Sequence, residues 1–227
     1  RSAGVNISSG YSNVILGYEA AESLTTGQAN VIIGDATAAS ADSDENVIIG
    51  HRAGRGGISN KAVIIGPYAV TEGTTTTDID GTIAIGYYAL NALKSGAYNT
   101  AIGYEALKTM TKGTKNTAIG YRALIAMSGS AGDTNNTAVG YQAGVAMTTG
   151  TGNTLMGSSA GDAITVAVRN NLFGLDAGGS LTNGNDNVAI GKNALNNTTS
   201  TSFNVAIGNS AADAGLTAAA DGTIAIG

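Results

Sequence analysis

Few residues of this chain combine in a way that could perform catalysis. The single His51 excludes a metal site built on a histidine pair, and a Ser-His-Asp triad would depend on this one residue. His51 also stands at a repeat position that is tyrosine elsewhere in the chain. We therefore interpret His51 as a turn residue.

Two acidic clusters could attract a cation, one at Asp42, Asp44 and Glu45, the other at Asp78 and Asp80. Neither has the spacing of an EF-hand loop, in which ligands alternate along twelve residues. The glycine-rich nonapeptide of calcium-binding β-helices is also absent from the sequence. We interpret both clusters as solvated turns and predict neither a metal ion nor another cofactor.

Glycine-rich stretches could cradle a phosphate, but none has the complete motif. Gly150 and Gly152 lack the full spacing, and the pair Gly191-Lys192 lacks the upstream glycine and the following Ser or Thr of a P-loop. Both stretches are typical of turns between short strands. Because no acidic pair recurs in a catalytic arrangement either, the sequence predicts that the protein is not an enzyme.

The tyrosines are the strongest candidates for binding. Tyr87, Tyr104, Tyr121 and Tyr141, like Tyr18, each follow a glycine directly, so stacked repeats would align them in a column. One interpretation is an exposed aromatic strip that binds the sugar rings of a receptor glycan. The other is that each ring packs on its neighbours at a corner or a subunit seam. Both interpretations stay open at this point.

Composition indicates a β-rich protein that folds. The chain has 227 residues with 34 Gly, one Pro, no Trp and no Cys, and 43% of its residues are hydrophobic. Glycine, asparagine and threonine with short runs of Ile and Val are typical of strands joined by turns. The net charge is −5 and no basic cluster is present, which excludes the basic surface that nucleic-acid binding requires. No apolar run is long enough to insert into a membrane.

A repeat organises almost the whole chain. Glycines that close an apolar triplet recur thirteen times, and seven of the twelve intervals between them are 17 residues. These glycines are Gly17, Gly34, Gly50, Gly66, Gly86, Gly103, Gly120, Gly140, Gly157, Gly174, Gly191, Gly208 and Gly227. We interpret residues 1–227 as one repeat domain, with a degenerate repeat at 1–12 and regular repeats at 13–227. Because the chain stops inside a unit, we expect it to be a segment of a longer fibre.

A period of 17 residues with two short apolar stretches predicts one coil of a parallel β-solenoid, or β-roll, of about thirteen coils. One strand is expected at the N-V-A-I-G stretch and a second near Y-x-A-L. The repeated positions are structural in this interpretation. We expect an amide ladder at the asparagines, a corner at the glycines and close packing at the alanines. In two adjacent repeats these positions are Asn99, Ile102, Gly103, Ala106, Asn116, Ile119, Gly120 and Ala123.

The first strand is apolar on both faces. In Val31-Ile32-Ile33 the first and third side chains point one way and the second points the other. Strands with this pattern are buried on both sides. A coil of 17 residues is too thin to cover both faces itself, so we expect a second copy of the chain to cover the outer one.

Variation between repeats carries further expectations. The segments NTAIGYEAL and NTAIGYRAL differ at one position, Glu105 against Arg122, which we interpret as facing solvent. Longer loops are expected at 71–80 and 127–133. Leu155-Met156 and Leu172-Phe173 replace Ala-Ile in two later repeats, which indicates a local widening or a filled gap where three chains meet.

The repeat resembles the head repeats of trimeric autotransporter adhesins, with an N-S-V-A-I-G signature. The variants NTAIGYEAL and NTAVGYQAG look more like repeats in phage tail fibres and bacterial surface fibres. The resemblance covers residues 10 to 227. It implies a left-handed parallel β-roll, a homotrimer, and an extracellular location on a virion tail fibre or a bacterial cell surface. This sequence departs from the adhesin pattern in its longer period and in the tyrosine after the glycine.

Two functions are compatible with these observations. The first is a structural and adhesive extracellular fibre segment whose partners are its own copies and a host cell-surface receptor or glycan. The alternative is a monomeric β-solenoid that binds a repetitive surface such as ice or a polysaccharide, because Thr100, Thr117, Thr137 and Thr154 share one strand position. In the first and last repeats Val takes this position, so the threonine face would be short.

Overall fold

The computed structural model describes residues 3–38, 40, 42–55, 60–72, 79–129, 132–214, 216 and 220–227. It contains thirteen strands of three residues each. They are β1 (Val14–Leu16), β2 (Val31–Ile33), β3 (Val47–Ile49), β4 (Val63–Ile65), β5 (Ile83–Ile85), β6 (Thr100–Ile102), β7 (Thr117–Ile119), β8 (Thr137–Val139), β9 (Thr154–Met156), β10 (Asn171–Phe173), β11 (Val188–Ile190), β12 (Val205–Ile207) and β13 (Ile224–Ile226). The described part of the chain contains no α-helix.

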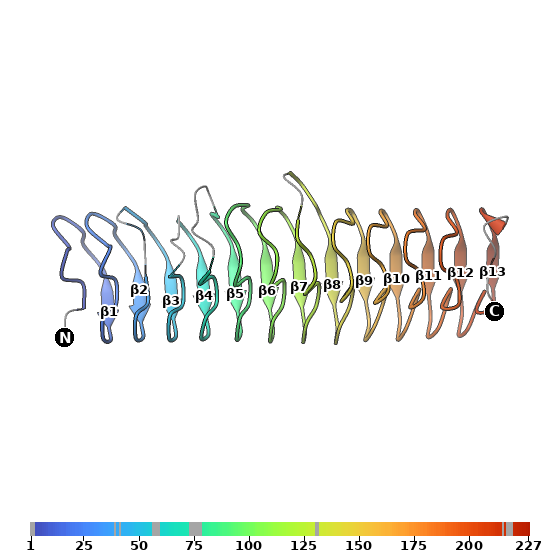
Figure 1. Cartoon of the computed structure of the whole chain (residues 1–227), viewed down its shortest axis with the longest axis horizontal. Helices are drawn as coiled ribbons and strands as arrows, with labels where there is room; N and C mark the ends of the chain where they lie inside the picture. The colour runs from blue at the N-terminus through green and yellow to red at the C-terminus, as the bar shows by residue number, and fades with distance from the viewer. Residues whose placement is uncertain are drawn as a thin grey trace.

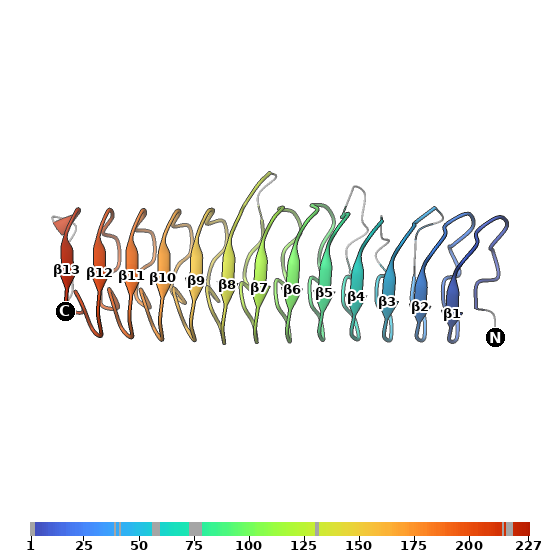
Figure 2. The ribbon, with the colours of Figure 1, turned by 180° about the vertical axis from the view of Figure 1, so that it is seen from behind.

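The thirteen strands form one parallel sheet in chain order. Each strand pairs with the next in register, so that Thr100 lies opposite Thr117, which lies opposite Thr137. The strands follow one another along the long axis, and the chain begins and ends at opposite ends of the row, as views from both sides show (Figure 1 and Figure 2). This arrangement is a parallel β-solenoid, as the repeat predicts. We call each strand with the return segment that follows it one coil.

The second strand expected near Y-x-A-L is not present in the described residues, and the chain makes turns there instead. Glu105 and Leu107 both adopt left-handed φ angles, of 56° and 51°. As a result, their N–H groups point to opposite neighbours. Glu105 donates to the Tyr87 carbonyl at 2.9 Å, and Leu107 donates to the Ala123 carbonyl at 3.1 Å. The backbone is thus hydrogen-bonded to both neighbouring coils without forming a strand.

The glycine that follows each strand forms the corner. Gly103 has a φ of 137°, which a residue with a side chain rarely adopts. A Cβ atom at Gly103 would also overlap the carbonyl oxygen of Gly120 in the next coil. Since Gly120 is in the same situation against Gly140, the stacking itself requires glycine in every coil.

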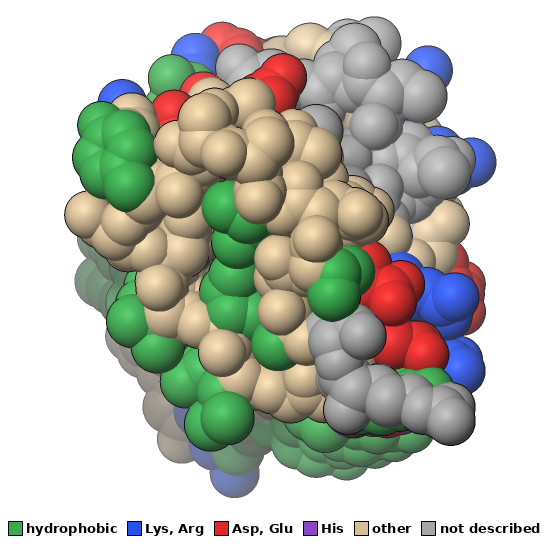
Figure 3. All heavy atoms as spheres, turned by 90° about the vertical axis from the view of Figure 1, so that its left-hand side faces the viewer, with side chains coloured by type: hydrophobic (Ala, Val, Ile, Leu, Met, Phe, Trp, Pro, Cys, Tyr) green, Lys and Arg blue, Asp and Glu red, His purple; other side chains and the backbone are tan. Residues whose placement is uncertain are grey.

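The core is a column of small and medium side chains inside the coils. The middle residue of each strand points inward, and from β2 to β12 it is buried, as at Ala101 and Ala118. Ala106 and Ala123, three residues after the corner glycines, are fully buried beside it. Seen from the N-terminal end, hydrophobic side chains run through the middle of the cross-section and charged side chains lie at its rim (Figure 3).

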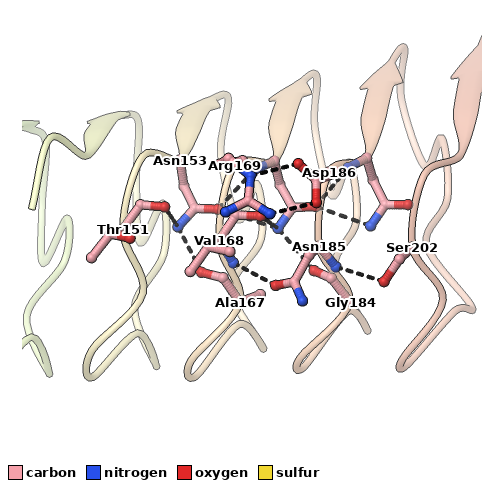
Figure 4. A network of polar contacts seen from close by, with 11 residues as sticks. Thr151, Asn153, Ala167, Val168, Arg169, Gly184, Asn185, Asp186 and Ser202 are labelled. Atoms are coloured by element: carbon pink, nitrogen blue, oxygen red, sulfur yellow. Dashed lines mark hydrogen bonds and ion pairs between the residues drawn. The ribbon is translucent and has the colours of Figure 1, made fainter.

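A ladder of buried asparagine side chains joins successive coils. The Oδ1 atom of Asn153 accepts from the backbone N–H and the Nδ2 group of Asn170, at 3.0 and 3.2 Å. The Nδ2 group of Asn153 donates to the Ala167 carbonyl at 2.8 Å. Asn99 and Asn116 are linked in the same way, at 3.0 Å. Figure 4 shows part of this ladder, together with the ion pair of Arg169 and Asp186 on its outer side. The repeat itself therefore satisfies the buried asparagine side chains. Among the described residues, the buried hydroxyl groups of Thr82, Thr198 and Thr201 have no hydrogen-bond partner.

The bulky residues of β9 and β10 point both ways: Leu155 and Leu172 point into the core, and Met156 and Phe173 lie on the outer face. Leu155 and Leu172 are fully buried inside their own coils, where Ala stands in the preceding repeats. Space for them comes from Gly161 and Gly178, which stand where the coils of β5 to β7 have Leu. A Cβ atom at Gly178 would lie 2.7 Å from a methyl group of Leu172. In these two coils the large side chain therefore stands in the strand instead of the turn.

The two longer loops are only partly described. Residues 73–78 of the loop expected at 71–80, and residues 130 and 131 of the loop at 127–133, lie outside the described residues. The second loop is fixed at its end by Asp133, whose carboxylate accepts from Thr114 at 2.7 Å and pairs with Lys115 at 2.6 Å. This end of the loop is therefore bound to the coil that precedes it.

Candidate functional site

The outer face of the sheet is a continuous surface that the described part of the chain leaves uncovered. It consists of the first and third residues of each strand, which point away from the core because side chains alternate along a strand. The third residues form an unbroken apolar column, which we call the third column. Its members are Leu16, Ile33, Ile49, Ile65, Ile85, Ile102, Ile119, Val139, Met156, Phe173, Ile190, Ile207 and Ile226. None of these side chains is buried by the chain itself.

The first residues of the strands, the first column, change in polarity along the sheet. They are Val or Ile from β1 to β5 and again from β11 to β13. Between these stretches, β6 to β9 have Thr and β10 has Asn171. The outer face therefore has one uniformly apolar column beside a column with a polar central stretch. Ile102 and Ile119, predicted as structural positions, lie on this outer face rather than in the core.

Tyr87, Tyr104, Tyr121 and Tyr141 form a continuous stack, which we call the tyrosine column. The centroids of successive rings are 5.3, 5.4 and 5.2 Å apart, and the rings are parallel to within 17°. Exposed fractions are 37–43% for the first three side chains and 53% for Tyr141. The rings are thus both packed on one another and open to solvent. Because the inner rings cover each other's faces, only their edges and hydroxyl groups are accessible to a partner.

Other aromatic rings cover the N-terminal end of the tyrosine column. Tyr68 and Tyr88 lie edge-on to Tyr87, with centroids at 6.0 and 4.4 Å. His51 lies edge-on to Tyr68 at 5.2 Å, and its Nδ1 atom is 2.9 Å from an Asp35 carboxylate oxygen. His51 therefore occupies the turn position that the repeat indicates and packs against the aromatic cluster.

The position of Glu105 was predicted to face solvent, and its burial shows that this prediction is wrong. Its side chain is only 7% exposed, and its carboxylate pairs with Lys108 at 2.7 Å and with Arg122 of the next coil at 2.8 Å. The hydrogen bond from Lys108, and then that from Arg122, lowers the pKa of Glu105 below its usual value, although burial acts in the opposite direction. Glu105 and Arg122 differ in sign because they are partners. Their separation of 17 positions, one repeat period, is the sequence signal that they lie side by side.

Described members of the two acidic clusters accept hydrogen bonds from neighbouring coils, and Asp42 accepts from the Thr26 hydroxyl. An Asp44 carboxylate oxygen accepts from the Gln28 N–H at 2.8 Å, and Asp80 accepts from the Asn60 N–H at 2.7 Å. Asp78 lies outside the described residues. Within the described ranges, no group of three or more His, Asp or Glu side chains could hold a metal ion.

The glycines considered for phosphate binding are placed in turns of the coil. Gly191 is a corner glycine with a φ of 131° that packs on Gly208, so Lys192 begins a turn and not a helix. Gly150 is buried and accepts from the Asn136 amide at 2.8 Å through its carbonyl. Neither glycine presents the series of N–H groups that a phosphate loop uses.

Comparison with known proteins gives no assignment. A scan against protein-family models finds no match to this chain, and searches of curated proteins and of solved structures return none. In the part of the chain that the structure describes, no helix has the length and apolarity that crossing a membrane requires.

Proposed function

We propose that this protein is a structural and adhesive fibre segment that assembles as a homotrimer through its outer sheet face. The observation that carries the proposal is the unbroken third column, apolar from β1 to β13 and uncovered by its own chain. Contiguous apolar surface of this kind is uncommon on monomeric proteins. The resemblance of the repeat supports a left-handed β-roll, three chains, an extracellular location, and attachment to a receptor or glycan on a host cell.

The size of the face is sufficient for an interface between chains. Twelve strand spacings of about 4.8 Å give a length of roughly 58 Å, and two columns about 7 Å apart give a width on the order of 14 Å. The product, on the order of 800 Å², is what one partner contributes to a standard stable interface.

The polarity of the first column favours copies that are parallel and in register. In that arrangement the polar stretch from Thr100 to Asn171 meets itself in the neighbouring copies. In an antiparallel arrangement centred on β7, the polar β10 would face the apolar β4. Parallel copies therefore avoid placing buried polar side chains against apolar ones.

Light scattering measures the predicted assembly directly. We expect a mass three times the 22.3 kDa of one chain at micromolar concentration. Ile119→Lys, at the centre of the third column, should give monomers that keep their circular dichroism, because a buried lysine at a three-fold seam lacks a partner. Thr149→Lys is the matched control, since coil β6 already has Lys112 at that exposed position. A wild-type monomer, or a trimer that survives Ile119→Lys, would contradict the proposal.

The alternative is a monomer that binds ice or another repetitive surface through Thr100, Thr117, Thr137 and Thr154. These residues do form an in-register column on the outer face. Their neighbours in the third column are Ile102, Ile119, Val139 and Met156, so the hydroxyl groups form a single row. Thermal hysteresis of a monomeric sample would favour this alternative, and its absence would exclude ice binding.

A further inference from the structure

The two ends of the tyrosine column are different. At the N-terminal end, Tyr68 and Tyr88 lie against Tyr87. At the C-terminal end, Tyr141 stacks on Tyr121 with one face, and the next position in the column is Ser158. Tyr141 is accordingly the most exposed ring of the four, at 53%. Its second face is turned toward a position where the repeat has left out a ring.

Ser158 occupies the tyrosine position without a change in the backbone. The Ser159 N–H donates to the Tyr141 carbonyl at 2.8 Å, and the Asp176 N–H donates to the Ser158 carbonyl at 3.0 Å. The equivalent bonds join the coils of the tyrosine column, such as that from Arg122 to the Tyr104 carbonyl at 2.9 Å. The missing ring is therefore a change of side chain alone.

The space left by that side chain has the thickness of one ring. The next large side chain in the column is Leu175, 44% exposed and two coils beyond Tyr141. Two coil spacings amount to about 9.6 Å. Tyrosine rings in the column stack at 5.2–5.4 Å. One six-membered ring at the level of Ser158 would thus contact Tyr141 on one side and Leu175 on the other.

The residues beside this position are polar. In the coil of β7, the residue that follows the column position reaches the ring of its own coil: the Arg122 guanidinium lies 5.4 Å from the Tyr121 centroid. The corresponding residues here are Gln142, Ser159 and Asp176, all half-buried. They offer an amide, a hydroxyl and a carboxylate. A peptide aromatic ring would leave these groups without partners, whereas a sugar has hydroxyl groups for them.

We infer that the free face of Tyr141 above Ser158 binds a single pyranose ring of a glycan. One face of a pyranose presents C–H groups, which complement the negative face of an aromatic ring. Its hydroxyl groups would meet Gln142, Ser159 and Asp176. The proposed function includes attachment to a receptor or glycan, and this inference names the class of ligand and the place where it binds. Only the biological role of the site rests on the proposed function.

Saturation-transfer NMR tests this site on the intact chain. The probes are the methyl pyranosides of glucose, galactose, mannose and N-acetylglucosamine at millimolar concentration, with p-cresol as an aromatic competitor. We expect transfer to the C–H groups of at least one glycoside. Ser158→Tyr continues the natural column and should abolish the transfer. The matched control Asn209→Tyr, at the same position three coils later, should leave it intact.

A second variant keeps the test decisive if Ser158→Tyr does not fold. Tyr141→Leu keeps an apolar side chain but removes the ring, and it should weaken glycoside binding about threefold to tenfold. The inference is overturned if no glycoside shows transfer, if Ser158→Tyr binds like wild type, or if p-cresol displaces the glycosides at much lower concentration. Light scattering on the same samples separates the two proposals. A trimer that binds no glycoside overturns this inference alone, and a monomer that binds one overturns the trimer alone.

Discussion

At the scale of single residues, the pair of Glu105 and Arg122 shows how charges are arranged in a stacked fold. Each residue lies next to the residue at the same position in the neighbouring coil, so a charge is stabilised by the opposite charge one period away. Glu105 also has Lys108 in its own coil at 2.7 Å. Its carboxylate is 7% exposed, so these bonds compensate for the loss of water.

Glu105→Gln should destabilise the protein by about 1–2 kcal/mol at neutral pH, because it removes two charge-assisted hydrogen bonds whose cations stay half-exposed. The pKa of Glu105 is lowered in the folded state, so its stabilising contribution is complete above the pKa of the unfolded carboxyl group. The contribution falls as the pH drops and disappears below the folded pKa. The urea midpoints for unfolding of the wild type and of Glu105→Gln should therefore converge in acid.

Asp133→Asn provides the control for this comparison. Asp133 pairs with Lys115, but both side chains are about half exposed, at 52% and 50%. Screening by water makes such pairs weak. A loss at neutral pH as large for Asp133→Asn as for Glu105→Gln would contradict the role assigned to burial.

The sequence predicted some residues well and failed at others for a physical reason. The corner glycines and the asparagines recur at a fixed period, so one interaction explains every copy. Glu105 was misjudged because the variety of Arg, Gln, Asp and Asn at its position resembles the tolerance of an exposed site. Only the alignment of adjacent coils shows that the neighbour decides which residue fits.

At the scale of the element, the large core residue stands in the turn of some coils and in the strand of others. Ala101 in β6 accompanies Leu107 in the turn, whereas Leu172 in β10 accompanies Gly178. All four residues are fully buried. The sequence shows the apolar character of both positions, but not that they contact each other.

Exchange of the two residues in β10 and its turn tests this coupling. Leu172→Ala should cost about 2–5 kcal/mol through a cavity, and Gly178→Leu about 1–3 kcal/mol through overpacking. The double variant recreates the pair Ala189 and Leu195 of the next coil, where Leu195 has a φ of 58° against 61° at Gly178. We expect it to recover more than half of the summed loss in chemical denaturation. Additive losses would refute the coupling.

The strand that the sequence predicts after the corner is replaced by turns for a reason of topology. Tyrosine favours strands. The left-handed φ angles at Glu105 and Leu107 instead bring N–H groups to both neighbouring coils. Such angles cost on the order of 1 kcal/mol for a residue with a side chain. The hydrogen bonds between coils offset this cost, and no single repeat reveals them.

At the scale of the whole molecule, each coil contacts only its neighbours, so the fold is a one-dimensional stack. Removal of one whole period should therefore leave a folded protein. Deletion of residues 104–120 joins Gly103 to Tyr121 and keeps every column in register. We expect native circular dichroism and a particle shorter by about 5 Å in small-angle scattering.

A shorter deletion controls for the register. Removal of residues 104–111 leaves half a coil, which shifts the asparagine and glycine columns against those of the next coil. This variant should lose cooperative unfolding. Equal tolerance of both deletions would mean that the columns do not fix the register.

The placement of the two chain ends at opposite ends of the row has a mechanical consequence (Figure 1). A force that pulls both ends along the axis acts first on the outermost coil. The hydrogen bonds between this coil and the next then break one after another. Each released period of 17 residues lengthens from about 4.8 Å to roughly 58 Å of extended chain. A single chain under tension would thus lengthen about twelvefold, one coil at a time. It would dissipate mechanical energy while the remaining coils stay folded.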